Sequence, residues 1–286
     1  MIEVSIILPA YNEAQVIGRV LDGIREVAPP DGTWEIVVVD DGSDDGTGEI
    51  AKQHGARVVR HPYNKGNGAA VKSGLRAARG ERVCLLDADG QHDPRQIHTL
   101  LGRLDEYDLI IGARRRGQGG SAVRWIGNTG YNLLASYLSG RRITDVTSGF
   151  RAARRAPMVE FIPLYPNGFS YPITSTLALI KAGYSVDFEP IQVARRVGSS
   201  KIRILHDGAR FALIALRIVS LFSPLRVFLP ISAVLFAVGA GYGVWNVLAH
   251  TKIANGAVLC VLSSLLVFLI GLVSEQIALL RFERIQ

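Results

Sequence analysis

The sequence predicts an α/β domain with a mostly parallel sheet, followed by an amphipathic helix and two membrane-spanning helices. Short runs of β-branched and aliphatic residues alternate with helical segments up to about residue 205. Polar, glycine-rich or acidic residues follow each of the first four runs. Beyond them, residues 227–249 and 257–280 are almost uncharged. Each of these two runs is long enough to cross a bilayer core of about 30 Å as a helix.

The first two strands are expected at residues 3–8 and 35–39. The segment Pro9-Ala10-Tyr11-Asn12-Glu13 closes the first strand and leads into an amphipathic helix, with Asn12 as its expected cap. The acidic turn 40–47 follows the second strand and leads into another helix. Because right-handed crossovers join parallel strands, both loops should lie at the same edge of the sheet.

Three further strands are expected at residues 57–60, 82–86 and 108–112, with helices at 69–78 and 94–106 between them. The sequence contains neither GxGxxG nor GxxxxGK[ST], so it gives no direct support for a dinucleotide-binding fold or a P-loop. Gly66 and Gly68 precede the helix at 69–78. A flexible helix entry explains them at least as well as a phosphate contact does.

The turn after the fourth strand carries two aspartates, Asp87 and Asp89. Two carboxylates this close repel each other unless a cation lies between them. With the amide oxygen of Gln91 they offer hard oxygen ligands that suit Mg²⁺ or Mn²⁺, which would keep open positions for substrate phosphates. For this stretch taken alone, a solvated acidic turn is the alternative.

Five side chains of different chemistry follow the first four strands: Tyr11, Glu13, Asp41, Lys65 and Asp89. Turn chemistry explains glycine, asparagine and aspartate well, but it does not require tyrosine, glutamate or lysine at such places. Ligands of parallel sheets bind at the carboxyl ends of the strands. We therefore expect these five side chains to line one crevice.

Arginine dominates residues 114–155, where nine arginines accompany a single acid, Asp145. Each arginine alone fits a solvated surface, but together they follow a strand that ends at the same crevice, which favours a phosphate-rich ligand. The formal net charge of +7 agrees with an anionic partner, whereas the sequence lacks the aromatic interleaving of a nucleic-acid surface. His61 and His92 fall in predicted loops, where we expect solvated imidazoles rather than a general base.

Basic residues lie mainly outside the loop between the two spans. They are Arg210, Arg217 and Arg226 before the first span, Lys252 in the loop, and Arg281 and Arg284 after the second span. The positive-inside rule therefore places both termini in the cytosol. Residues 203–223 have the pattern of an amphipathic helix, which lies either in the membrane interface or against the preceding domain.

The two spans contain three residues that differ from ordinary lipid-facing ones. Gly239 and Gly243 allow close helix packing, either within the hairpin or between subunits of a homo-oligomer. Glu275 is an acid inside the second apolar run. It is expected to snorkel or to pair with an arginine, and a functional role follows only if it is buried.

Six motifs occur together in the chain. They are Pro9-Ala10-Tyr11-Asn12-Glu13, Val38-Val39-Asp40-Asp41-Gly42-Ser43, Asp87-Ala88-Asp89-x-Gln91, Gly112-Ala113-Arg114, Asp145-x-x-Ser148-Gly149-Phe150-Arg151 and Gly198-x-Ser200-Lys201. With these motifs, the chain resembles membrane-associated family 2 glycosyltransferases with the GT-A fold, in particular polyprenyl-phosphate (dolichyl-phosphate) hexose synthases. The resemblance covers residues 2 to about 203, in the family's order.

The resemblance implies a role for each matching position. The residues that resemble the family's nucleoside pocket are Pro9, Tyr11, Glu13, Val39 and Asp41, and Lys65 is also expected to bind the donor. The residues that resemble its metal and diphosphate site are Asp87, Ala88, Asp89 and Gln91. Arg114 and Arg124 are similar to arginines of the family that hold the donor diphosphate and the lipid phosphate. Lys201 and Arg203 are similar to basic residues of a loop late in the chain that closes over the site. The expected catalytic set is Asp89, Arg114, Arg124 and Lys201.

The resemblance also implies a function and a division of the chain. Residues 1–202 are expected to be a cytosolic GT-A domain, 203–223 an interfacial helix and 224–286 a transmembrane hairpin. The expected reaction is an inverting transfer of one hexose from GDP-mannose or UDP-glucose to a polyprenyl phosphate. A phosphomonoester has a second pKa near 6, so this acceptor is already a nucleophilic dianion and requires no strong base. Candidates to position it are Arg124, Arg151, Lys201 and Arg203.

Two other functions stay open. A glycosyltransferase acting on another lipid or on a protein hydroxyl would need a general base, and the sequence identifies none. A membrane-tethered nucleotide-sugar-binding protein without turnover would be expected to lack a metal ligand, whereas Asp87, Asp89 and Gln91 are all present.

Overall fold

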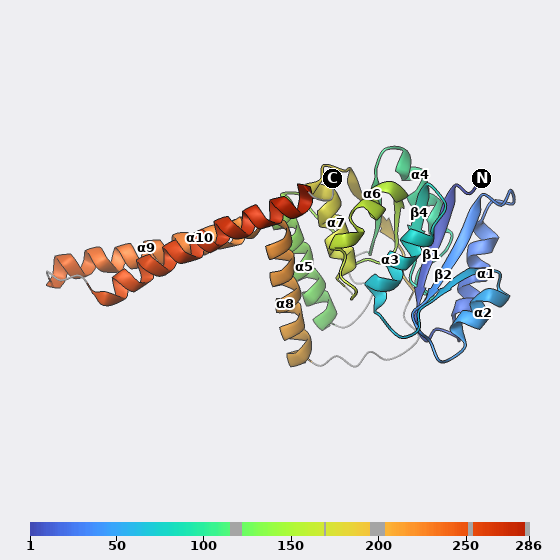
Figure 1. Ribbon diagram of the computed structural model, residues 1–286, viewed down its shortest axis with the longest axis horizontal. Coiled ribbons are helices and arrows are strands. Elements are labelled where there is room, and N and C mark those ends of the chain that lie inside the picture. The colour runs from blue at the N-terminus through green and yellow to red at the C-terminus, as the bar shows by residue number, and fades with distance from the viewer. Residues whose placement is uncertain (115–121, 169, 195–203, 251–253, 284–286) are drawn as a thin grey trace. The chain divides into compact units, whose positions relative to one another are not determined.

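The structure is a computed structural model that describes residues 1–114, 122–168, 170–194, 204–250 and 254–283 (Figure 1). It divides into two compact units, Met1–Asp207 and Gly208–Gln286. The first unit contains the sheet and the loops at its edge. The second contains the apolar helices at the end of the chain.

In the described part of the first unit, seven strands form one sheet in the order β3-β2-β1-β4-β6-β5-β7. They are β1 (Val4–Ala10), β2 (Trp34–Asp40), β3 (Arg57–Arg60), β4 (Arg82–Leu85), β5 (Leu109–Arg114), β6 (Arg151–Arg154) and β7 (Val186–Ile191). Strand β6 is antiparallel to its neighbours β4 and β5, and every other neighbouring pair is parallel. The mostly parallel sheet predicted from the sequence is therefore confirmed.

This topology brings two kinds of segment to one edge of the sheet. The carboxyl ends of β1 to β5 all lie there, and because β6 runs the other way, the segment that precedes Arg151 arrives at the same edge. The loops after β1, β2, β3 and β4, the end of β5 and residues 145–150 thus lie along one edge of the sheet, although they are far apart in sequence.

Helices cover both faces of the sheet (Figure 1). They are α1 (Ile17–Val27), α2 (Thr47–Gln53), α3 (Asn67–Ala77), α4 (Gln96–Gly102), α5 (Ala122–Ser139), α6 (Arg155–Glu160) and α7 (Tyr171–Lys181), with 3₁₀ turns η1 (Arg103–Asp105) and η2 (Ile162–Leu164). On one face, Ile6 and Leu8 of β1 join a buried cluster with Leu21 of α1. Alternate residues of a strand point to opposite faces, and Ile7 accordingly meets α3 at Gly74.

Two local expectations differ from the structure. The helix expected at 94–106 ends as α4 at Gly102, and a 3₁₀ turn follows it. Asn12 is not the cap of α1, because the residue at the N-cap position is Val16. Asn12 instead has φ of 56°, a left-handed conformation that asparagine tolerates better than most residues do.

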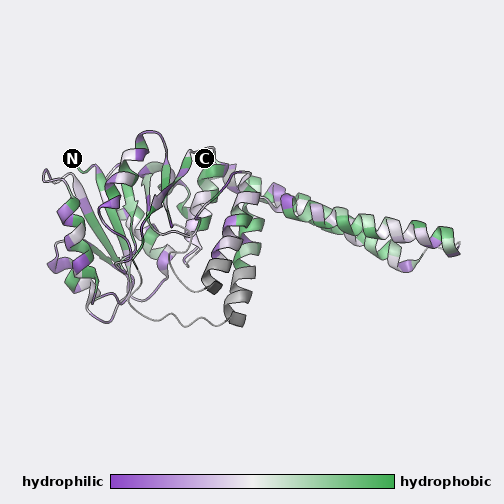
Figure 2. Ribbon diagram, turned by 180° about the vertical axis from the view of Figure 1, so that it is seen from behind, coloured by the Kyte–Doolittle hydropathy of each residue, from purple (hydrophilic) through white to green (hydrophobic). Residues whose placement is uncertain are grey.

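The second unit contains most of α8 (Ile204–Phe222), with α9 (Pro224–His250) and α10 (Asn255–Glu283). Helices α9 and α10 contain the two spans expected from the sequence, and the mean hydropathy of their most apolar windows is 1.9 and 2.7. Only 11% and 17% of these windows are buried, so they differ from the buried core helices of a soluble protein. Figure 2 shows that hydrophobic residues occur along the length of both helices.

The two spans pack against each other as a hairpin through small residues. A Cβ placed on Gly239 would lie 2.8 Å from Cβ of Cys260, and one on Gly243 would lie 3.4 Å from Cβ of Ala257. Of the two packing roles expected for these glycines, the structure therefore shows the one within the hairpin. Glu275 has a structural partner as well, because its Oε2 accepts a hydrogen bond from the backbone nitrogen of Leu225, 3.1 Å away, at the start of α9.

Candidate active site

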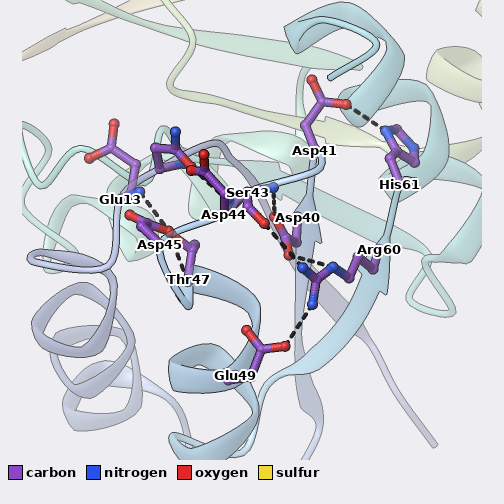
Figure 3. Close-up of polar contacts among 11 residues, drawn as sticks. Glu13, Asp40, Asp41, Ser43, Asp44, Asp45, Thr47, Glu49, Arg60 and His61 are labelled. Atoms are coloured by element: carbon purple, nitrogen blue, oxygen red, sulfur yellow. Dashed lines mark hydrogen bonds and ion pairs between the residues drawn. The ribbon is translucent and has the colours of Figure 1, made fainter. Parts of the chain in front are cut away.

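The loops after β1 and β2 are locked together by hydrogen bonds between side chains and backbone. The backbone nitrogen of Asn12 donates to Oγ of Ser43 at 3.0 Å, and the nitrogen of Asp44 donates to Oδ1 of Asn12 at 3.2 Å. The nitrogen of Glu13 donates to Oγ1 of Thr47 at 2.9 Å (Figure 3). The left-handed backbone of Asn12 thus serves a contact between loops. It holds the Tyr11 and Glu13 region next to the end of β2.

The predicted nucleoside pocket begins at the ends of these two strands. Pro9 and Val39 are paired in register, and Val39 is fully buried. Tyr11 is 47% exposed, so its ring is available to a ligand. The sheet therefore brings the expected residues of β1 and β2 together.

Asp41 is buried at the end of β2 and binds the loop that follows β3. Its Oδ1 accepts a hydrogen bond from the backbone nitrogen of Lys65 at 2.9 Å, and its Oδ2 accepts one from the nitrogen of Gly66 at 2.8 Å. Nδ1 of His61 lies 2.6 Å from the same Oδ1 (Figure 3). The expectation of a solvated His61 is wrong, because its side chain is only 6% exposed.

Lys65, Gly66 and Gly68 follow β3, and the lysine side chain and the two glycines make different contacts. The side chain of Lys65 is exposed, and its Nζ lies 5.6 Å from the centroid of the Tyr63 ring. A Cβ on Gly66 or Gly68 would collide with backbone atoms of residues 166–168. These two glycines therefore permit close packing of the chain against itself, which accounts for them without a phosphate.

The acidic turn follows β4 as predicted. Asp87 and Asp89 are partly exposed, whereas Ala88 between them is buried. The backbone nitrogen of Gln91 donates to Oδ1 of Asp89 at 3.1 Å, which fixes the turn. Gly149 lies against the other carboxylate, since a Cβ on it would lie 2.7 Å from Oδ1 of Asp87.

This arrangement fits a metal that takes few protein ligands. Among the described residues, no three side chains of histidine, cysteine, aspartate or glutamate gather closely enough to bind a metal by themselves. A hard cation such as Mg²⁺ commonly binds one or two carboxylates together with substrate phosphates and water. Asp87, which packs closely against Gly149, and Asp89 match that donor set.

His92, the second histidine expected to be solvated, is also buried, at 9% exposure. Its ring centroid lies 5.0 Å from that of Phe150, and its Nε2 lies 3.8 Å from Oδ2 of Asp87. The expectation failed because hydrophilic loop residues were assumed to face water. In this protein the loop after Asp89 folds back onto the residues that precede β6.

Arg114, the last residue of β5, makes a two-point ion pair with Asp145. Its Nε lies 2.7 Å from Oδ2 and its Nη2 lies 2.9 Å from Oδ1 of Asp145, and Nη2 also donates to Oγ1 of Thr147 at 2.6 Å. Hydrogen bonding to Asp145 raises the pKa of Arg114, and the charges of Asp145 and Asp87 raise it further. Burial alone would raise the pKa of Asp145, but the hydrogen bonds and charge of Arg114 outweigh it and lower that pKa.

Of the other basic residues of the predicted phosphate site, the structure describes the side chain of Arg151 alone. Arg151 is fully buried, and its guanidinium donates to the carbonyl oxygen of Ser148 at 2.6 Å and to Oγ of Ser175 at 2.9 Å. In this arrangement it faces the protein interior, and burial lowers its pKa. The side chain of Arg124 on α5, and the whole of Lys201 and Arg203, lie outside the described residues.

The sequence reasoning missed three residues that help to build the site: His61, His92 and Ser73, whose hydroxyl lies 2.8 Å from Nε2 of His61. Gly149 occurred in a quoted motif, but no role was given to it. His61 and His92 lie in loops and Ser73 is a polar residue within α3, so none carries a periodic signal of burial, and only the fold reveals these contacts.

The mostly parallel sheet, with two carboxylates after β4 and a paired arginine at the end of β5, defines a GT-A-like α/β domain. The chain belongs to glycosyl transferase family 2, which it matches over residues 5–161. It is therefore a glycosyltransferase, as the motifs implied. Residues 223–280 match a second family, described as the GtrB C-terminal hairpin, and with the two apolar helices this match identifies a membrane protein.

Several known proteins are similar in sequence. The undecaprenyl-phosphate mannosyltransferase of Micrococcus luteus is 32% identical over 213 residues, which cover 68% of this chain and 86% of that protein. The dolichyl-phosphate hexose transferase of Haloferax volcanii is 32% identical over 210 residues, which cover 72% of this chain and 90% of that protein. An uncharacterized protein of Methanocaldococcus jannaschii is 36% identical over 159 residues, covering 52% of this chain and 64% of that protein.

A solved structure supports the fold. Glucosyl-3-phosphoglycerate synthase from Mycobacterium tuberculosis, crystallised with Mn²⁺, UDP and phosphoglyceric acid, superposes with a TM-score of 0.61 and 24% identity. The match covers 76% of this chain and 78% of that chain. At this identity the likeness establishes the GT-A-like architecture and nothing about the substrate.

Proposed function

We propose that this chain transfers one hexose from a nucleotide diphosphate sugar, of the GDP-mannose or UDP-glucose type, to a polyprenyl phosphate. The observation that carries the proposal is the presence of the acidic turn 87–89 and of Arg114 at the same edge of the sheet, in a chain that also has a membrane hairpin. The M. luteus and H. volcanii relatives, named for prenyl-phosphate mannose and hexose transfer, support the acceptor class.

The donor is assigned to the loops after β1, β2 and β4. Pro9, Tyr11, Glu13, Val39, Asp41 and Lys65 would hold the nucleoside side, and Asp87, Ala88, Asp89, Gln91 and Arg114 the diphosphate. Asp87, Asp89 and Gln91 would hold Mg²⁺ or Mn²⁺, which when bound neutralises charge on the leaving diphosphate. Arg114 contributes a fixed positive charge at the same edge, held in orientation by Asp145.

The acceptor phosphate is assigned to Arg124, Lys201 and Arg203. Their side chains lie outside the described residues. We leave Arg151 out of this set because its guanidinium is fully buried. A phosphate dianion attacks the anomeric carbon from the side opposite the leaving diphosphate, so the configuration inverts. The buried state of His61 and His92 agrees with a reaction that has no imidazole base in contact with the acceptor.

The membrane segments would keep the long lipid acceptor beside the catalytic domain. Residues 203–223 are proposed as an interfacial helix between the domain 1–202 and the hairpin 224–286. On α8, Leu213 and Leu216 are 68% and 60% exposed, which suits contact with lipid. The basic flanks support a cytosolic location for both termini and, with them, for the domain.

The test is transfer of labelled sugar from GDP-mannose and UDP-glucose, assayed separately, to a short polyprenyl phosphate with Mn²⁺. A polyprenol without the phosphate and a protein extract serve as alternative acceptors. Product formed only with the phosphorylated lipid supports the proposal. Transfer to hydroxyl acceptors would favour a different glycosyltransferase, and nucleotide-sugar binding without any transfer would favour a binding protein.

A further inference from the structure

We propose that His61 is a positioning residue of the pocket that binds the nucleotide sugar. His61 fixes the carboxylate of Asp41 in the orientation that accepts a hydrogen bond from the nucleoside. This inference rests on the proposed function, because it takes Asp41 as part of the nucleoside site. It assigns a role to a buried histidine that the reaction itself does not use.

Three residues from three elements form a continuous hydrogen-bonded chain. Asp41 follows β2, His61 follows β3, and Ser73 lies on α3. Nδ1 of His61 lies 2.6 Å from Oδ1 of Asp41, and Nε2 lies 2.8 Å from Oγ of Ser73. Because an ionised carboxylate only accepts, Nδ1 must carry a proton, whichever way the Ser73 hydroxyl points.

The hydrogen bonds around Asp41 leave its carboxylate one acceptor position without a partner among the described contacts. Oδ1 accepts from both His61 and the backbone nitrogen of Lys65, and Oδ2 accepts from the nitrogen of Gly66. A carboxylate offers about four acceptor positions, so these three contacts leave one, on Oδ2. That position suits an N–H or O–H group of a nucleobase or ribose.

The orientation depends on His61 because the loop after β3 would otherwise hold the carboxylate only by its backbone. The backbone nitrogen of His61 is also tied to the carbonyl oxygen of Asp40 at 2.8 Å, so the ring projects from a fixed point. Its far nitrogen is anchored on α3 through Ser73. The imidazole therefore links α3 to the carboxylate through one contact at each ring nitrogen. Figure 3 shows the contact with Asp41.

Two substitutions test the two contacts of the His61 ring, with Asp41 and with Ser73, one at a time. In His61→Asn the amide nitrogen takes approximately the place of Nδ1 and keeps the bond to Asp41. In His61→Gln it takes approximately the place of Nε2 and keeps the bond to Ser73 instead. Binding of UDP and GDP to the full chain in detergent with Mn²⁺ is measured by calorimetry, and KM and kcat for sugar transfer are measured in parallel.

The expected result is a Kd for the preferred nucleotide that rises about tenfold in His61→Gln, as for the loss of one hydrogen bond to a charged group. KM for the nucleotide sugar rises in parallel, whereas kcat changes by less than about threefold. In His61→Asn, both Kd and KM stay within about threefold of wild type. Rescue by asparagine but not by glutamine is the signature of positioning, since a merely structural role would not distinguish the two.

The chain offers a matched control in His54, which follows α2 and whose Nδ1 lies 2.7 Å from Oδ1 of Asp22 on α1. His54→Gln breaks the same kind of pair and should leave nucleotide Kd unchanged. Equal nucleotide binding by wild type and His61→Gln, or equal loss in the asparagine and glutamine variants, would overturn the inference alone. Failure of wild type to bind either nucleotide would overturn the proposed function together with it.

Discussion

The carboxylate of Asp145 receives two parallel hydrogen bonds from the guanidinium of Arg114, from Nε at 2.7 Å and from Nη2 at 2.9 Å. The pair joins the end of β5 to the segment that enters β6, and the side chain of Asp145 is only 6% exposed. Two-point pairs of this kind fix the orientation of an arginine as well as its charge. The ion pair with Asp145 therefore fixes the position of the Arg114 guanidinium, and with it the positive charge at this edge of the sheet.

Asp145→Asn should lower both stability and activity. A buried pair that loses one partner costs about 3–5 kcal/mol, and because Arg114 is partly exposed we expect the lower end of that range, about 3 kcal/mol at pH 7. The pKa of Asp145 is lowered in the folded state, so its contribution is present above the unfolded pKa and is lost as the pH falls through the folded value. The difference between wild type and variant should therefore shrink below about pH 4.

Chemical unfolding of the full chain in detergent, at pH 7 and at several values below 4, measures this difference. Asp105→Asn is the control, because Asp105 forms an exposed pair with Arg82 at 2.9 Å. Exposed pairs contribute about 0–1 kcal/mol, so this change should be nearly neutral. A stability difference for Asp145→Asn that does not vary with pH would contradict the assignment.

Gly149→Ala should weaken metal binding. Its Cβ would lie 2.7 Å from Oδ1 of Asp87, so the carboxylate or the backbone must move. Overpacking of this kind costs about 1–3 kcal/mol. We expect Mn²⁺ affinity in the presence of nucleotide to fall by about tenfold or more, which corresponds to at least about 1.4 kcal/mol.

Titration of Mn²⁺ into the nucleotide-bound protein measures this affinity. Gly102→Ala is the matched control, since nothing lies within 4 Å of its added Cβ and its φ is −63°. That change should leave metal affinity unaltered and stabilise the protein by up to about 1 kcal/mol. Unchanged metal affinity in Gly149→Ala would show that the position of Asp87 does not matter for the metal.

Glu275 should stabilise the hairpin by capping α9. Its Oε2 accepts from the backbone nitrogen of Leu225, one of the first-turn nitrogens that have no partner within the helix. Glu275→Ala should cost about 1–2 kcal/mol, whereas Glu275→Gln retains an oxygen acceptor and should cost less. Thermal unfolding in detergent measures both. Equal melting temperatures for alanine and glutamine would refute the capping role.

The sequence predicted the sheet edge well, because strand ends carry local signals. The strands through β5 and the loops after them could be located from aliphatic runs followed by glycine, aspartate and asparagine. The two membrane helices were equally clear from their uncharged length. The acidic turn at Asp87 and Asp89 and the basic end of β5 at Arg114 were located from the same signals.

Burial was the property that the sequence did not predict. Arg151 lies in a motif with serine and glycine and was expected to contact phosphate, yet its guanidinium donates to internal carbonyl and hydroxyl oxygens. His61 and His92 were expected in water, and both are covered by segments distant in sequence. Strand β6, with only four residues and two arginines, has no hydrophobic period that would announce it. Each of these features depends on contacts across the sheet rather than along the chain.

The most direct test of the account compares sugar transfer by wild type and Asp89→Ala, using the identified nucleotide sugar and a polyprenyl phosphate. The reaction is run with Mn²⁺ and after chelation. Asp93→Ala serves as control, because Asp93 is exposed on the same loop and caps the nitrogen of Arg95 at 3.0 Å.

The account predicts glycolipid phosphate from wild type and Asp93→Ala with Mn²⁺, and at least about 100-fold less from Asp89→Ala or after chelation, a loss of about 2.7 kcal/mol in transition-state stabilisation. Transfer by Asp89→Ala at the wild-type rate, with and without Mn²⁺, would contradict it.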